Sequence, residues 1–216
     1  MDIVIPSAAS IGVFAVAATL LLLTPGPAVL YVVARSVEQG RIAGLASVFG
    51  ITTGTLVHVL ASTLGLSALL ASSALAFALV KYAGAGYLIY MGVRRILKQS
   101  DPPVSPLRLP KRSLGRLYRD GFVVNLLNPK TALFFLAFLP QFVDPARGAV
   151  PMQMAFLGLL FTLMGLTSDG LYALVAGTAG RWVKRNGPYL RWERYVTGSV
   201  FIGLGVTAAF AGNGRK

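Results

Sequence analysis

The sequence predicts an all-α polytopic membrane protein with six transmembrane helices, arranged as a 3+3 inverted repeat in which helices 1 and 4 are broken. Three observations lead to this prediction: long uncharged runs, basic residues concentrated in alternate loops, and similar motifs in the two halves of the chain. The chain of 216 residues is 55% hydrophobic and 12% charged, whereas soluble domains carry about 25% charged residues. This composition excludes an ordinary soluble domain.

Uncharged runs locate the expected spans. Runs without Asp, Glu, Lys or Arg cover residues 3–34, 42–80, 148–168 and 195–214. Runs of this length are transmembrane helix candidates, because a helix needs about 20 mainly apolar residues to cross a bilayer. With the apolar stretches that carry a few charges, we expect spans at 8–34, 42–68, 73–95, 119–143, 151–178 and 194–212.

The basic residues are concentrated in alternate loops of this arrangement. Fifteen of the 20 Lys and Arg residues lie within 35–41, 94–119 and 181–194. Because cytoplasmic loops are enriched in Lys and Arg, we expect both termini outside and the basic, proline-rich linker 98–118 in the cytoplasm. The net charge of +13 therefore reflects membrane orientation and contact with anionic lipid headgroups, and no nucleic-acid partner is expected.

The two halves of the chain, 1–97 and 119–216, contain similar motifs in the same order. Residues 25–31 resemble 129–135, and residues 52–56 resemble 167–171. Each half has an odd number of expected spans, so the second half would enter the membrane inverted relative to the first. Inverted repeats with a broken helix in each half are a recurring design of secondary transporters.

Each half has a predicted helix break inside an apolar run. The motifs are Thr24-Pro25-Gly26-Pro27 and Asn128-Pro129-Lys130. Proline removes a backbone donor and disfavours a helical conformation of the residue before it, while Thr and Asn are good N-caps and proline suits the first helical turn. We therefore expect a new helix to begin after Thr24 and another after Asn128. Within a membrane, such breaks are tolerated where they are buried in protein or line a cavity.

The two new helices would begin near the bilayer centre and point in opposite directions. Their free amide donors and positive dipole ends favour an anion or a carboxylate. Lys130 adds a full positive charge, which costs about 2.5–3.5 kcal/mol in a bilayer unless it is paired or hydrated. The alternative is that the prolines only kink the helices for packing.

Asp169 is the only acid well inside a predicted span, and an acid in that position indicates a functional site. It is expected to neutralise Lys130, to receive a substrate amino group or to carry a coupling proton. A purely structural ion pair is the alternative. Without cysteines, a second histidine or a nucleophile–base set, the sequence predicts no metal site, no cofactor and no enzymatic activity.

His58 follows the motif Gly50-x-x-x-Gly54, which predicts close helix packing. We weigh a proton-coupling role for this histidine against an interior residue that is only hydrogen-bonded. Farther along the chain, Phe134, Phe138 and Phe142 recur every four residues. They are expected to form a packing or lipid-facing stripe rather than a substrate site.

Three segments resemble the family of lysine exporters and homoserine–threonine efflux proteins: the Thr-Pro-Gly-Pro motif with the Gly-rich stretch after it, residues 81–92, and residues 125–135 with Asn-Pro-Lys. The resemblance covers essentially the whole chain. It implies a bacterial cytoplasmic-membrane exporter of amino acids that is driven by the proton gradient. Asp169 matches an acid common in the fifth span of that family, whereas a second-span acid of some members is replaced here by Thr55 or another neutral residue.

We therefore expect a secondary transporter that exports a neutral amino acid, of the homoserine, threonine or leucine type, by proton antiport. Export of a basic amino acid or of an inorganic cation is the alternative. Expected partners are the amino acid, protons and membrane lipids, and a homodimer is left open. The predicted substrate-binding residues are Thr24, Pro25, Gly26, Pro27, Asn125, Asn128, Pro129, Lys130 and Asp169, and the predicted proton-coupling residues are Asp169 and His58.

Overall fold

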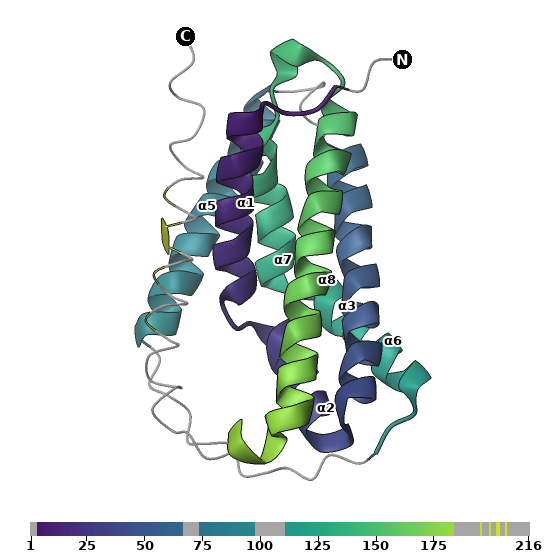
Figure 1. Cartoon of the computed structure of the whole chain (residues 1–216). Coiled ribbons are helices and arrows are strands. Elements are labelled where there is room, and N and C mark those ends of the chain that lie inside the picture. The colour runs from purple at the N-terminus through teal and green to yellow at the C-terminus, as the bar shows by residue number, and fades with distance from the viewer. Residues whose placement is uncertain are drawn as a thin grey trace.

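The computed structural model describes residues 4–66, 74–97 and 111–183, together with residues 195, 199, 202, 203 and 206. Within these residues the chain is helical and has no strand (Figure 1). The helices are α1 (Ala8–Leu23), α2 (Pro27–Gln39), α3 (Arg41–Ala61), α5 (Ala74–Leu97), α6 (Leu114–Leu126), α7 (Pro129–Leu133) and α8 (Val150–Val183). Most of the predicted linker 98–118 and of the predicted span 194–212 lies outside the described residues.

Two helical segments, Arg41–Gly65 and Val150–Thr178, are long and apolar enough to cross a membrane. Two bent pairs also qualify, so the described residues contain between two and four candidate spans. The first pair is α1 with α2, bent by 50°, and the second is α6 with the segment Pro129–Phe142, bent by 46°. Both bends occur at the predicted proline motifs. α5 is a helix at the position of the expected third span, and the total of six spans stays a prediction.

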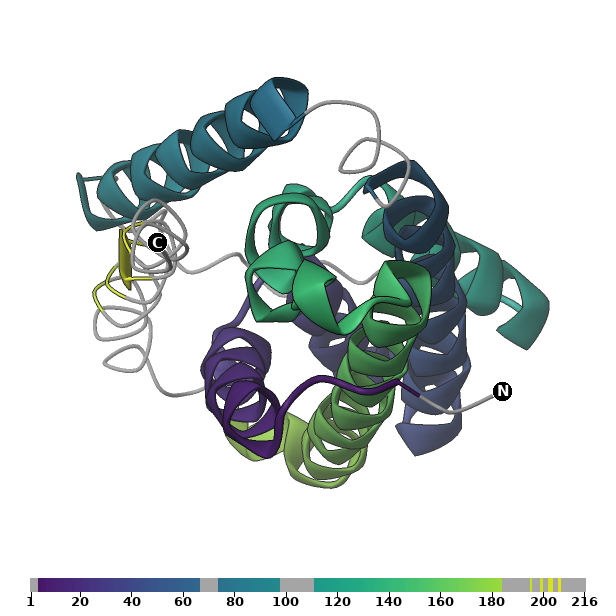
Figure 2. The same ribbon diagram turned by 90° about the horizontal axis from the view of Figure 1, so that it is seen from above.

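The two bent pairs run in opposite directions (Figure 1). α1 begins near the start of α8, where the Arg147 side chain donates to the carbonyl of Ile5 at 3.2 Å. α6 begins at the other end of the molecule, where Gln39 and the backbone of Arg112 exchange hydrogen bonds of 3.0 Å. Figure 2 shows α5 at the periphery, and it packs against the turn that follows α7. Thr24 and Asn128, which lie at the breaks, are buried, so both breaks lie in the interior, between the two ends.

Basic residues gather at the end where α2 meets α3 and where α6 begins. Arg41 starts α3 and packs against Gly177 near the end of α8. In the same region Arg112 forms an ion pair with Asp120, and Arg35 lies 4.0 Å from Glu38. Arg35, Arg41 and Arg112, which come from the predicted cytoplasmic loops and belong to the described part of the chain, therefore lie at one end of the molecule.

α3 and α6 pack closely because glycines lie at their contact. A Cβ atom added to Gly50 would lie 1.9 Å from the carbonyl oxygen of Tyr118. A Cβ atom added to Gly121 would lie 2.5 Å from the carbonyl oxygen of Ser47, and Gly54 lies on the same contact. The close packing predicted from the Gly50-x-x-x-Gly54 motif is confirmed, because no larger residue fits at Gly50 without moving a helix.

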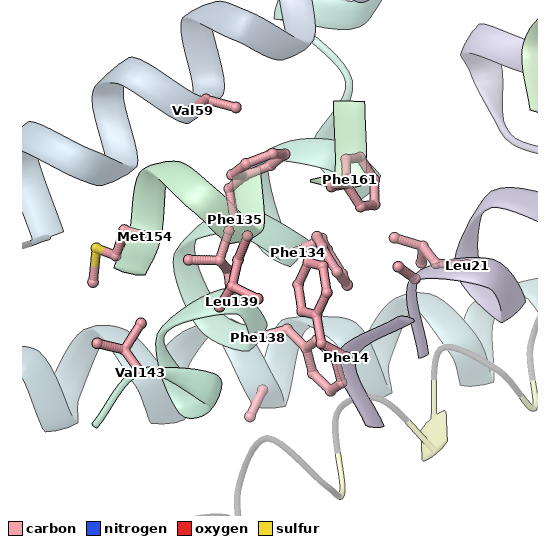
Figure 3. Packing of buried hydrophobic residues seen from close by; sticks show 13 residues of the cluster. Phe14, Leu21, Val59, Phe134, Phe135, Phe138, Leu139, Val143, Met154 and Phe161 are labelled. Carbon is pink, nitrogen blue, oxygen red and sulfur yellow. The ribbon is translucent and has the colours of Figure 1, made fainter. Parts of the chain in front are cut away.

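The main apolar core lies where α1, α8 and the chain after α7 meet (Figure 3). After α7 the chain forms a π-helical turn, Phe134–Phe138, and then a 3-10 turn, Leu139–Phe142. Phe134 stacks on Phe161 of α8 at 4.6 Å between ring centroids and contacts Phe14 of α1 at 5.7 Å. Phe134 and Phe138 are at most 3% exposed. The sequence left open whether this phenylalanine stripe packs internally or faces lipid. Phe134 and Phe138 pack internally.

Candidate functional site

α7 begins with the cap that the sequence predicts. Asn128 is the N-cap residue, and its Oδ1 accepts a hydrogen bond from the backbone N–H of Lys130 at 3.1 Å. Pro129 occupies the first turn, where a missing backbone donor has no consequence. Asn128 Nδ2 also donates to Asn125 Oδ1 at 3.4 Å. The second break is therefore closed by side chains from its own neighbourhood.

α2 begins differently, and the prediction that Thr24 caps it is wrong. Gly26 is the N-cap residue, with no side-chain cap among the described residues, and Pro27 follows in the first turn. Thr24 instead ends α1, and its hydroxyl donates back to the carbonyl of Leu20 at 2.7 Å. A threonine hydroxyl can bond a carbonyl one turn earlier as readily as an amide ahead, and here Pro25 and Pro27 have no amide hydrogen to offer.

Lys130 connects the two breaks. Its side chain is buried, at 6% exposure, and its Nζ donates to the carbonyl oxygen of Thr24 at 2.5 Å. The last carbonyls of a helix carry partial negative charge and lack partners within the helix, so the end of α1 is a favourable place for an ammonium group. The hydroxyl of Tyr172 on α8 donates to the neighbouring carbonyl of Leu23 at 3.0 Å. Side chains from the second half of the chain thus bind the end of the first half's helix.

Asn125 holds the second break against α3. Its Nδ2 donates to the carbonyl of Ile51 at 2.9 Å and to Thr55 Oγ1 at 2.8 Å, while its Oδ1 accepts from Thr131 Oγ1 at 3.0 Å. Asn125 is 2% exposed, so these bonds replace the water that its amide would otherwise bind. This network makes Asn125 a positioning residue for the start of α7.

His58 lies on α3, one turn beyond Thr55. Its Nε2 lies 3.1 Å from the backbone carbonyl oxygen of Asn125, and its ring stacks on Phe135 at 6.0 Å between centroids. A carbonyl only accepts, so this contact assigns the Nε2 hydrogen to the histidine. His58 has the surroundings of a hydrogen-bonded interior residue, and a role in proton transfer stays a hypothesis.

A small cavity of about 30 Å³ lies between the breaks and α8. Lys130 and Asp169, each 6% exposed, line it together, so one cavity holds buried groups of opposite charge. A cavity of this size holds one or two water molecules. The predicted residues that line it are Gly26, Asn125, Asn128, Lys130 and Asp169. Within the described part of the chain, Thr24, Pro25, Pro27, Pro129 and His58 are not in its lining.

Threonine hydroxyls in the lining were missed by sequence reasoning. Thr52, Thr131 and Thr162 line the cavity together with Thr55. Thr52 and Thr162 donate to carbonyls one turn earlier on their own helices, at 2.9 and 2.8 Å. Each such hydroxyl oxygen keeps an acceptor lone pair. A usable signal existed for Thr162, which lies seven residues before Asp169 and therefore on the same face of a helix.

Broken helices that meet beside buried charged groups are a recurring feature of helical membrane transporters. The chain belongs to the LysE type translocator family, whose model matches residues 19–212. It is 32% identical over 194 residues to the homoserine/homoserine lactone efflux protein of Salmonella typhimurium, an alignment that covers 89% of this chain and 92% of the relative. It is also 31% identical over 195 residues to an uncharacterized membrane protein of Vibrio cholerae, covering 90% and 93%.

No solved structure gives a significant match to the chain. The family resemblance noted in the sequence is confirmed, and it identifies the chain as a membrane protein of a transporter family. Membership of that family supports a function in amino-acid efflux.

Proposed function

We propose that this protein is a secondary transporter that exports a neutral amino acid across the bacterial cytoplasmic membrane in exchange for protons. The observation that carries the proposal is the pairing of buried Lys130 and Asp169 in the lining of one cavity. A zwitterionic amino acid has a carboxylate for the first and an ammonium group for the second. The relative named for homoserine and homoserine lactone efflux supports a substrate of the homoserine or threonine type.

The proposed architecture has six spans, with residues 1–97 and 119–216 as inverted repeats on either side of the linker 98–118. The opposite directions of the two bent pairs support it, as does the meeting of their breaks through Lys130 and Thr24. The gathering of basic residues at one end supports a cytoplasmic linker and external termini, because positive loops stay in the cytoplasm.

Substrate binding requires the cavity to open. A volume of about 30 Å³ holds water molecules but not an amino acid, so helices around the breaks must separate to admit the substrate. The substrate carboxylate then meets the helix start at Asn128 and the charge of Lys130, and its ammonium group meets Asp169. This assignment uses the positive dipole of a helix start for the anion.

Proton exchange follows if Asp169 binds either a proton or the substrate ammonium group. A protonated carboxyl group offers no charge to an ammonium group, and a carboxylate that is bound to the ammonium group is protected from protonation. The two occupants therefore exclude each other at Asp169. The site alternates between access to one side of the membrane and access to the other. If it carries the substrate in one direction and a proton in the other, the result is antiport.

Transport measurements in proteoliposomes test the proposal. The purified protein is reconstituted, a pH gradient is imposed, and the movement of labelled homoserine, threonine, leucine and lysine is followed. We expect gradient-driven accumulation of a neutral amino acid and weaker movement of lysine. Protein-free vesicles and vesicles with a collapsed gradient are the controls. Equal movement with and without the gradient would contradict antiport, and preference for lysine would favour the alternative of a basic substrate.

A further inference from the structure

We propose that the C-terminal end of α1 is a binding site for a primary ammonium group, which Lys130 fills until the ammonium group of the substrate replaces it. The inference rests on the proposed function, because it assigns a position to the amino group of the exported amino acid. In the proposed function Lys130 binds the substrate carboxylate. Here Lys130 first occupies the site of the substrate ammonium group, and it meets the carboxylate only after it has been displaced.

The contact between Lys130 and Thr24 already shows a primary ammonium group bound at this helix end. Nζ donates to the carbonyl oxygen of Thr24 at 2.5 Å. Lys130 carries an –NH₃⁺ group with three donors, and a free amino acid carries the same group. A group that binds one therefore binds the other, and displacement of Lys130, which lines the cavity, would expose the Thr24 carbonyl to the substrate.

The surrounding groups make this helix end a built site. Thr24 is 2% exposed, and Asp169, which lines the cavity together with Lys130, is 6% exposed, so these acceptors are largely shielded from water. Tyr172 donates to the carbonyl of Leu23 at 3.0 Å, which fixes the last turn of α1 beside the site. A buried carboxylate and carbonyl oxygens with partial negative charge are the acceptors that an ammonium group needs when it leaves water.

Space explains why Lys130 must leave when the substrate arrives. A Cβ atom added to Gly26 would lie 3.0 Å from Lys130 Cδ and 3.5 Å from Nζ, so the lysine stem fills the space beside the first break. The remaining cavity measures about 30 Å³. Lysine has a flexible four-carbon stem, so its displacement would enlarge the cavity and free Nζ to meet the substrate carboxylate.

Binding of a simple amine tests the site apart from transport. The probe is propylamine, and N,N,N-trimethylpropylammonium, which has no N–H donor, is its chemical control. Affinity is measured from ligand-induced thermal stabilisation of the purified protein. We expect Lys130→Met to bind propylamine about tenfold more tightly than wild type. A site that its own lysine fills about nine-tenths of the time is open for only about one-tenth of it, which weakens the apparent affinity about tenfold. The trimethylated probe should show no gain.

Two further variants keep the test decisive. Lys111→Met removes an exposed lysine before α6, and it should retain the wild-type amine affinity. Gly26→Ala keeps the Lys130 charge but adds a methyl group against its stem, so it should raise amine affinity by about twofold through partial displacement. If Lys130→Met does not fold, Gly26→Ala decides. Unchanged or weaker propylamine binding in the folded variants would overturn the inference.

The result is separable from the proposed function. Wild-type protein that moves no amino acid in proteoliposomes, beside a gain of amine binding in Lys130→Met, would reject the transport proposal and leave the ammonium site standing. Amino-acid transport by the wild-type protein, without a gain of amine binding in Lys130→Met, would keep the transport proposal and reject the ammonium site.

Discussion

The two helix breaks differ in how the unpaired backbone groups at the helix ends find hydrogen-bond partners. At the second break, the start of the new helix is capped by its own neighbour Asn128, and Asn125 bonds both to Thr131 and across to α3, so the backbone of α7 is satisfied locally. At the first break, the end of α1 is bound by Lys130 and by Tyr172, both from the other half of the chain. We infer that the second break is a stable reference point, whereas the first changes its bonding whenever these partners move.

Replacement of Asp169 should have the largest effect, because it removes the negative charge beside both breaks. Asp169→Asn keeps size and hydrogen bonding but cannot exchange a proton. We expect it to abolish uphill export under a pH gradient, while exchange of substrate without a gradient persists. Gradient-driven uptake in inverted vesicles and counterflow in the same preparation measure the two activities.

The double variant Asp169→Asn/Lys130→Met separates coupling from charge balance. If Asp169 only neutralises Lys130, removing both charges should restore transport, because an unpaired buried charge costs more than loss of the pair. Full gradient-driven transport by Asp169→Asn alone would rule out the proton role.

Replacement of Asn125 tests whether the second break is the stable one. Asn125→Ala removes hydrogen bonds to Ile51, Thr55 and Thr131 and leaves buried polar groups unsatisfied. We expect a loss of about 3 kcal/mol in the free energy of unfolding, measured by denaturation in detergent. Thr53→Val is the matched control, since it breaks an exposed bond to Tyr118 on the same helix pair. Equal stability of the two variants would contradict the comparison.

Replacement of Asn128 tests the cap alone. Asn128→Ala should reduce stability by about 1 kcal/mol, which is typical for loss of an N-cap side chain. Asn128→Asp retains a side-chain acceptor for the Lys130 amide and should recover most of the loss. The melting temperatures of the three proteins check this, and equal values for Ala and Asp would show that the cap is unimportant.

The smallest effect is expected at the first break. Tyr172→Phe removes the hydrogen bond to Leu23 and should reduce stability by about 0.5–1 kcal/mol. Because the end of α1 at the first break depends on such partners, we expect Tyr172→Phe to change the transport rate clearly although the loss of stability is small. Tyr118→Phe, which loses an exposed hydroxyl contact, is the matched control. Initial rates of counterflow give the measurement, and identical rates in both variants would count against a changeable first break.

The sequence predicted the positions of both breaks and the cap at Asn128, because prolines and N-caps act through neighbours within a few residues. It did not predict the Lys130–Thr24 contact, which joins atoms 106 residues apart and uses a backbone carbonyl that has no residue-specific signature. Thr24 was misassigned because the N-cap rule treats its hydroxyl as an acceptor for amides ahead, whereas Pro25 and Pro27 have no amide hydrogen and the hydroxyl donates back to Leu20.

The interior polar network was only partly visible in the sequence. Asp169 was identified because acids are rare in apolar spans, and Asn125 was identified through the family resemblance of residues 125–135. The threonines of the cavity were not identified, since a threonine hydroxyl is easily satisfied on any helix. The π-helical turn Phe134–Phe138 was also missed. A spacing of four residues suits an α-helix, whereas in the structure the turn is wider and its Phe134 packs against Phe14 and Phe161.

The glycine contact between α3 and α6 has a mechanical consequence. With Gly50 placed directly against the backbone of Tyr118 and Gly121 against that of Ser47, neither helix can slide past the other without a collision of main chains. These helices should therefore travel as one rigid body during the transport cycle. α2 joins α3 through Gly40, whose φ of 86° is a backbone conformation that only glycine adopts easily. A larger residue at this position would therefore strain the junction through which α2 is attached to the rigid pair.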